Sequence, residues 1–281
     1  MARGSIRSPW RRPLGVLAYG LVLVYAALLV IPVYFVVVSA FKDNQAIFGS
    51  PLALPSSLGL TNFARAQDGA NLSQALFNSV TLTLSAELLT LALAIPASYA
   101  LARAGGRVAD ALDRLFSLGF LVPAFAVLVP TLLLAVAAGL FRNTLFLILF
   151  YPATALPLSI VLLTQFMRSI PMELAESATV DGASEFGILR RIWFPLSMPG
   201  VVAVVILNFL NFWNEYVFAL VILGPASRTV QVAVPTLRSG LIVEYGLLSA
   251  GVLISVIPVY VVYVFLQRQM QEALTAGALK G

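Results

Sequence analysis

Long stretches without charged residues alternate along this chain with short segments that carry most of its charge. A transmembrane helix needs about 20 mostly apolar residues to cross a hydrocarbon core of about 30 Å. Several stretches meet this requirement, and they predict six transmembrane helices in an all-α membrane protein. They run from Pro13 to Phe41, from about Leu76 to Leu101, between Arg114 and Arg142, between Arg142 and Arg168, from Ile192 to Leu223, and from Tyr245 to Gln267.

The first apolar stretch follows a basic start, as a cleavable signal peptide would. A signal core has only about 7–15 apolar residues, and this run is about twice as long. We therefore predict an uncleaved first transmembrane helix.

Lysine and arginine fall mainly in alternate loops. Twelve of the 17 lie on the side that holds both termini in a six-helix arrangement. The positive-inside rule then places both termini in the cytoplasm. The predicted organisation is a cytoplasmic segment at residues 1–13, a first transmembrane helix at 14–41, an extracytoplasmic segment at 42–74, a core of five transmembrane helices at 75–268, and a cytoplasmic tail at 269–281.

Composition narrows the chemistry that the chain can perform. It is 60% hydrophobic and 10% charged, which excludes an ordinary soluble domain. The absence of cysteine and histidine excludes thiol chemistry, Cys/His zinc sites and a Ser-His triad. Neither lysine, Lys42 or Lys280, follows a glycine-rich loop, so the chain has no P-loop ATPase. We therefore predict no metal and no cofactor in this chain. We also predict no nucleic-acid partner, because the net charge of +5 is explained by membrane orientation.

The cytoplasmic loop at residues 169–199 differs from the rest of the chain because it holds four of the 12 acidic residues. Ser169 is placed to cap a first short helix, and Asp181-Gly182 is a turn signal that should end it. Ser184 is placed to cap a second helix with apolar residues at helical spacing, which Pro195 and Pro199 should end. The pattern predicts two short helices with an acidic edge and an apolar face.

This loop resembles the EAA loop of binding-protein-dependent ABC importer permeases. The family pattern is Glu-Ala-Ala, three residues, Gly, nine residues and Ile-x-Leu-Pro; here it reads Glu176-Ser177-Ala178, Gly182 and Ile192-Trp193-Phe194-Pro195. Ser177 and Phe194 depart from the pattern. Further segments resemble the carbohydrate branch of the family, and in particular its maltose-type second permease subunit. They are Asp181-Gly182-Ala183-Ser184, Asn78-Ser79, Trp213-Asn214-Glu215-Tyr216 and the C-terminal Leu274-Thr275-Ala276-Gly277-Ala278-Leu279-Lys280-Gly281.

The resemblance implies a type I importer fold in a bacterial or archaeal cytoplasmic membrane. It also implies a second homologous permease subunit, two separate subunits that bind ATP and Mg²⁺, an extracytoplasmic solute-binding protein and a sugar substrate. The loop would then be a coupling loop that docks on the ATPase, while this chain itself is not an enzyme. The implied coupling residues are Glu173, Glu176, Ser177, Ala178, Asp181, Gly182, Ala183, Phe186, Ile192, Trp193 and Pro195. Glu185, taken alone, is better explained as part of a solvated linker.

Polar residues inside the predicted helices are candidates for a translocation path. Asn208, Asn211 and Glu215 have spacings of three and four, which places them on one face of a continuous helix, and Asn214 lies beside them. They either offer hydrogen bonds to sugar hydroxyls or join helices. Glu87 is a further candidate, for the path, for helix pairing or for a proton site.

Other functions remain open at this stage. The chain could serve polyol or glycerol-phosphate cargo, although no arginine cluster within a span favours an anionic substrate. An ion-coupled secondary transporter would use Glu87 or Glu215 as its ion site. An intramembrane enzyme is disfavoured, because the spans contain no histidine, cysteine or aspartate.

Overall fold

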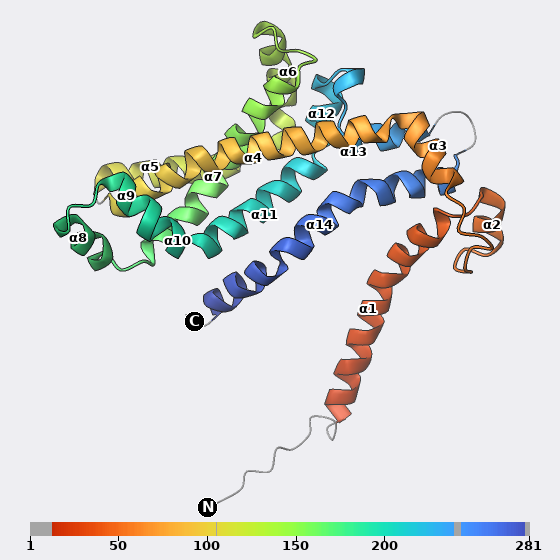
Figure 1. Ribbon diagram of the computed structural model, residues 1–281, viewed down its shortest axis with the longest axis horizontal. Helices are drawn as coiled ribbons and strands as arrows, with labels where there is room; N and C mark the ends of the chain where they lie inside the picture. Colours follow the sequence, from red (N-terminus) through yellow and green to blue (C-terminus); the bar gives the residue numbers. More distant parts are fainter. Residues whose placement is uncertain (1–12, 105, 239–242, 279–281) are drawn as a thin grey trace, which may run out of the picture. The chain divides into compact units, whose positions relative to one another are not determined.

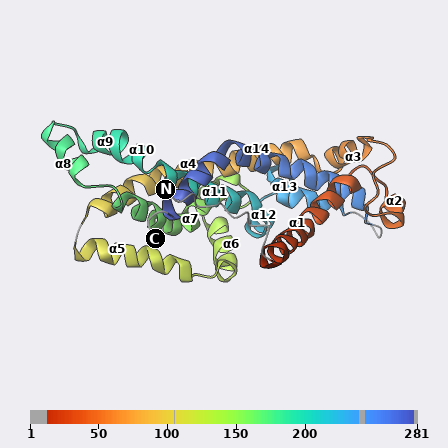
Figure 2. The ribbon, with the colours of Figure 1, turned by 90° about the horizontal axis from the view of Figure 1, so that it is seen from below.

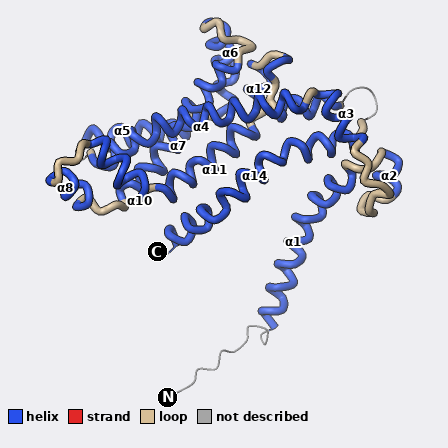
Figure 3. The backbone as a smooth tube through the Cα atoms, viewed as in Figure 1, coloured by secondary structure: helices blue, strands red, loops and turns tan. Residues whose placement is uncertain are grey.

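A computed structural model describes residues 13–104, 106–238 and 243–278. Every regular element within these ranges is helical, as the hydropathy pattern predicts (Figure 3). The predicted cytoplasmic segment at 1–13 lies almost wholly outside the described residues, as do the last three residues of the C-terminal motif. Contacts divide the chain into two compact units, one with residues up to Ala70 and from Leu237 to Ile254, the other with residues 71–236 and from Ser255 onward.

The first unit begins with α1 (Pro13–Ser39), whose exposed side chains are apolar on all sides. A helix without a polar face is suited to lipid. The short helices α2 (Asn44–Gly49) and α3 (Thr61–Ala70) follow. The unit also holds the first turns of α14 (Tyr245–Ala278), which continues into the second unit.

Polar contacts tie the start of α14 to the segment around α2 and α3. Asn44 donates from Nδ2 to the Val243 carbonyl (2.7 Å) and accepts from the Tyr245 amide (2.9 Å). Arg65 and Glu244 form a two-pronged ion pair at 2.6 and 2.7 Å. The hydrogen bonds and charge of Arg65 hold the pKa of the Glu244 carboxyl below its ordinary value.

The second unit is built on α4 (Leu72–Arg103) and α7 (Thr144–Arg168), which form its most extensive helix pair. The helix α11 (Met198–Asn214) packs against both, and Figure 1 shows the three side by side. Small buried residues such as Ala86, Ala94 and Ala155 let the helices approach closely. Gly200 of α11 lies tightly against α7, because a Cβ atom there would lie 2.5 Å from Phe166 Cγ.

Four described helices are long and apolar enough to cross a membrane. They are α1, α4, α7 and α14. A fifth candidate span is the pair of helical segments Glu185–Leu196 and Met198–Asn214, which meet at a bend of 75°. The first, second, fourth and sixth predicted spans therefore appear as continuous helices, and six spans are not confirmed.

The third predicted span, between Arg114 and Arg142, is wrong as a continuous helix. The chain forms α5 (Arg107–Leu118), the short 3₁₀ turns η2 (Gly119–Leu121) and η3 (Ala124–Val127), and α6 (Leu128–Ala137). Figure 2 shows α6 leaving the line of α5 at a steep angle. Pro123 stands between the two turns, and because proline has no backbone N–H group it cannot donate the hydrogen bond that would continue a helix. Gly119 passes so close to α7 that a Cβ atom would lie 2.7 Å from Pro157 Cγ.

The fifth predicted span, from Ile192 to Leu223, is also broken. Its first break is the bend after Leu196, and Pro195 and Pro199 each stand in the first turn of a new helix, where proline is favoured. Its second break is at Glu215, whose backbone is extended, before α12 (Val217–Ile222) begins. The remaining short elements are η5 (Pro225–Ser227), α13 (Val230–Ala233) and η6 (Val234–Leu237).

Candidate functional site

The predicted coupling loop joins α7 to α11 and begins with α8 (Glu173–Val180). Its first turn carries Glu173 and Glu176, where negative charge complements the helix dipole. The prediction that Ser169 caps this helix is wrong. Ser169 follows α7 directly, and its hydroxyl donates back to the Phe166 carbonyl (2.7 Å).

The predicted turn at Asp181-Gly182 is confirmed. Gly182 has a φ of +84°, which glycine adopts without a steric penalty. The Gly182 amide donates to the Thr179 carbonyl (3.0 Å), and the Ala183 amide donates to the Ala178 carbonyl (2.9 Å). The predicted cap at Ser184 is also confirmed, since its Oγ accepts from the Gly187 amide (3.2 Å). These contacts fix where the second helix starts.

The second helix of the loop is less regular than predicted. It consists of α9 (Glu185–Ile188), the π-helical turn η4 (Leu189–Trp193) and α10 (Phe194–Leu196). Such π-turns in helices are frequent at functional sites.

Trp193 does not present its ring to a partner, because it is only 1% exposed. It forms a small core with Tyr99, Met167, Ala175 and Ile188, and Ala178 and Ile192 pack against that core partly buried. Trp193, which the resemblance implies as a coupling residue, therefore contacts its own chain and not an open surface of the loop. Its ring holds the loop on the ends of α4 and α7.

The other side of the loop faces away from this core. All the remaining predicted coupling residues are exposed: Glu173, Glu176, Ser177, Asp181, Gly182, Ala183, Phe186 and Pro195. Phe186 is 70% exposed, and Val180, which the motif does not mark, is 88% exposed. An apolar residue directly before the Asp-Gly turn was the available signal for Val180. The loop thus has one face packed on its own chain and one open face that combines acidic and large apolar side chains.

The predicted path residues of α11 do not form one stripe. Asn208 is buried and donates from Nδ2 to Ser159 Oγ on α7 (3.0 Å), so it joins two helices. Asn211 is exposed, and the exposed Asn214 donates to the Leu210 carbonyl of its own helix (2.8 Å).

Glu215 lies outside α11, so the prediction that it shares a helix face with Asn208 and Asn211 is wrong. Its carboxylate accepts from the amides of Phe218 (2.8 Å) and Ala219 (2.9 Å) and from the Tyr151 hydroxyl (2.7 Å). It therefore caps α12 and ties the break to α7, which compensates for the helix bonds lost there.

Glu87 on α4 is 6% exposed. Neither of its carboxylate oxygens has a hydrogen-bond partner among the described residues. Asn208 is close enough to interact with the carboxyl group, although no hydrogen bond of good geometry joins them. Glu87 thus faces a helix interface in this conformation.

Asn78 and Ser79, near the start of α4, hold a distant segment in place. Asn78 donates from Nδ2 to the carbonyls of Ala226 and Arg228, both at 3.0 Å. Ser79 Oγ accepts from the Val230 amide (2.8 Å). Two side chains in adjacent positions thereby fix residues 226–230 against α4.

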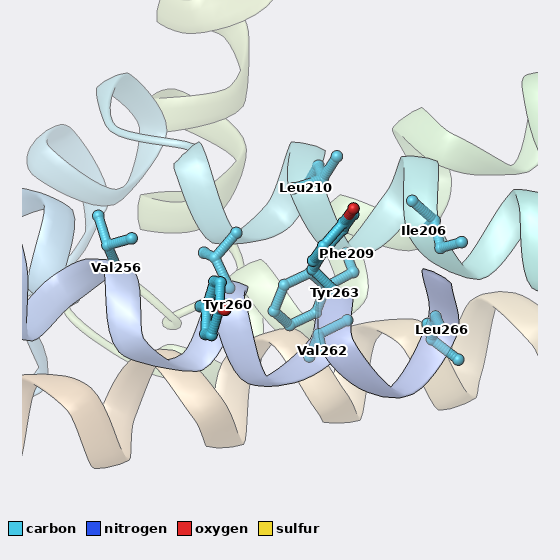
Figure 4. A pocket seen from close by; sticks show the side chains of 9 residues that line it. Ile206, Phe209, Leu210, Val256, Tyr260, Val262, Tyr263 and Leu266 are labelled. Atoms are coloured by element: carbon cyan, nitrogen blue, oxygen red, sulfur yellow. The ribbon is translucent and has the colours of Figure 1, made fainter. Parts of the chain in front are cut away.

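A groove of about 270 Å³ lies between α11 and α14 (Figure 4). Its lining includes Ile206, Phe209 and Val256, with Tyr260 and Tyr263 as the residues that carry polar groups. A sugar requires many hydrogen bonds, which this lining does not offer. The groove is therefore not a candidate sugar site.

Residues 94–275 match the family model of the binding-protein-dependent transport system inner membrane component. The chain belongs to this family. The match includes the loop at 169–199 and the residues around Glu215, whereas Glu87 and α1 precede it.

Two similar proteins are full-length relatives. The diacetylchitobiose uptake system permease protein NgcG of Streptomyces coelicolor is 29% identical over 100% of this chain and 93% of its own length. The trehalose transport system permease protein SugB of Mycobacterium tuberculosis is 32% identical over 93% of this chain and 95% of its own.

The fold also has a counterpart among solved structures. A chain in the crystal structure of a bacterial ABC transporter that imports the acidic polysaccharide alginate matches with a TM-score of 0.83. The match covers 95% of this chain and 100% of that chain, at 20% identity. The family member described here therefore has the type I ABC importer permease fold, with its helix breaks included in the matched region.

Proposed function

We propose that this chain is one of two membrane subunits of an ATP-driven sugar importer, and that residues 169–199 dock on a separate ATP-binding subunit. The open face of this loop carries the proposal. Large apolar residues on a water-facing segment are costly to leave exposed, and a fixed loop that presents them is typical of a binding surface. Phe186 and Val180 lie on the two helices that flank the Gly182 turn, together with the acidic Glu176 and Asp181.

The other subunits of the complex would supply the functions for which this chain has no residues. ATP and Mg²⁺ would be bound by two partner subunits, because the sequence has no P-loop lysine. A second homologous permease would complete the path, and a solute-binding protein would deliver the substrate at the outer face. Closure of the two ATP-binding subunits would move the loops and expose the path alternately to the two sides.

Sugar cargo is supported by the relatives, whose names specify diacetylchitobiose and trehalose, and by the alginate importer that shares the fold. Polyol or glycerol-phosphate cargo is the alternative. In either case Asn211 and Asn214, as exposed amides, are the path residues of α11 best placed to meet a hydroxylated solute. Asn208 and Glu215 would shape the path by joining helices around it. Glu87 stays a candidate for the path or for a proton site.

Transport by reconstituted vesicles tests this function. The complete complex, with binding protein outside and ATP inside, should accumulate diacetylchitobiose, trehalose or another member of a sugar panel. Accumulation should require both ATP and the binding protein, and a proton or sodium gradient should not replace them. Concentrative uptake by this chain alone under an ion gradient would contradict the proposal and favour an ion-coupled transporter.

A further inference from the structure

Glu185, the first residue of α9, reaches the end of α4. Its Oε2 accepts a hydrogen bond from the Tyr99 hydroxyl (2.7 Å) and forms an ion pair with Arg103. Arg103 Nη1 also donates to the Tyr99 hydroxyl (2.6 Å). The three side chains therefore contact one another in a closed triangle that spans two elements 82 residues apart in sequence. We call this triangle the loop clamp.

The clamp lies over the small core of the loop. The Tyr99 ring meets Trp193 edge-on at a centroid distance of 5.3 Å, and the Arg103 guanidinium lies 5.5 Å from the centroid of the same tyrosine ring. Tyr99 is thus buried on one side against the loop and hydrogen-bonded at its hydroxyl end. The polar clamp and the apolar core thus both join the loop to the end of α4.

The opposite end of α4 carries the second pair of anchors, Asn78 and Ser79. Tyr99 is separated from Asn78 by 21 positions, which corresponds to about 30 Å along a helix axis at 1.5 Å per residue. One helix thereby connects the coupling loop with the segment at residues 226–230. A movement of the loop that rotates or shifts α4 would therefore also displace residues 226–230 at the other end of the helix.

We propose that Glu185 is a positioning residue that links the coupling loop to α4, and that α4 carries the movement of the loop to residues 226–230. This inference rests on the proposed function, since it assumes that the loop is moved by an ATP-binding subunit. It names a route within this chain that neither the motif nor the family match assigns.

The clamp is partly exposed to water, so its effect on transport can be tested without a large change in folding stability. The Glu185 side chain is 68% exposed and that of Arg103 is 23% exposed. Ion pairs that face water contribute little to folding stability. Removal of the carboxylate should therefore leave the loop folded on its apolar core, but free to tilt against α4 when its partner moves.

The test compares ATP hydrolysed with sugar transported in the reconstituted complex. Glu185→Gln should assemble with the ATP-binding subunits and hydrolyse ATP, but the ATP used per sugar should rise between about twofold and thirtyfold. Asn78→Ala should raise the same ratio from the other end of α4. The charge swap Glu185→Arg with Arg103→Glu should bring the ratio back toward wild type. Asp110→Asn is the matched control, because this exposed carboxylate of α5 lies outside the loop and has no ion pair within the described part of the chain.

A wild-type ratio in Glu185→Gln or in Asn78→Ala overturns the inference. Loss of ATPase binding in Glu185→Gln that the swap does not restore also overturns it, because Glu185 would then act on the partner directly. Failure of the proposed function itself has a different signature, since the wild-type complex would not couple ATP to sugar uptake at all.

Discussion

Replacement of Gly182 by valine should strongly lower sugar-stimulated ATP turnover in the assembled complex while the chain still inserts into the membrane. The φ of +84° at Gly182 is strained for any residue with a Cβ atom and most of all for a β-branched one. The strain is about 1–2 kcal/mol or more, enough to open a two-helix loop at its turn. Phe186 and Val180, which lie on either side of the turn, would then no longer be held at their present positions relative to each other. Turnover should fall about tenfold or more, measured as ATP hydrolysis with binding protein and sugar present.

Gly182→Asn is the matched control for this loss. Asparagine tolerates the left-handed region better than other residues do, and a Cβ atom at Gly182 meets nothing within 4 Å of its own chain. The asparagine variant should therefore keep most of the turnover. Equal activity of the valine variant would show that the turn geometry is not needed for docking.

Replacement of Gly246 by alanine should strongly destabilise the first unit. An added Cβ atom would lie 2.0 Å from the backbone carbonyl oxygen of Lys42 and 2.7 Å from Asn62 Nδ2. Asn62 itself donates to the carbonyls of Ala40 and Lys42, so the backbone at this contact cannot simply withdraw. Overpacking of this kind costs about 3 kcal/mol. The purified variant should unfold at a lower temperature in detergent, and its segment at residues 42–60 should be cut sooner by protease.

Gly20→Ala provides the comparison, because a Cβ atom there meets nothing within 4 Å and the residue lies inside α1. Alanine favours a helix more than glycine does, so this variant should be neutral or slightly more stable. If the unfolding temperature of Gly246→Ala matches that of Gly20→Ala, Gly246 of α14 does not pack closely on the Lys42 carbonyl.

The long helices could be predicted from the sequence because their signal is local. Uninterrupted apolar residues mark α1, α4, α7 and α14, and the bilayer thickness sets their minimum length. The breaks could not be predicted in the same way, because they depend on contacts between distant residues. The turn at Gly119 is fixed by its packing on Pro157, and the break at Glu215 by a carboxylate that caps α12 and accepts from Tyr151.

The coupling loop was partly predictable for a similar reason. Gly182 and Ser184 act on their immediate neighbours, so the turn and the cap follow from sequence order. The directions in which Trp193 and Glu185 face could not be predicted from sequence order, because both side chains contact Tyr99 on another helix. A motif marks Trp193 as part of the loop without telling whether its ring faces inward or outward.

The account depends most on the open face of the loop meeting an ATP-binding subunit. Photo-crosslinkers placed at Val180 and Phe186 in the transport-competent complex test this contact directly. Phe125 on η3 is the control position, being 77% exposed and apolar but outside the loop. Crosslinks to the ATP-binding subunit should form from Val180 and Phe186 and not from Phe125. A complex that transports sugar but yields no such crosslink from either loop position would contradict the account.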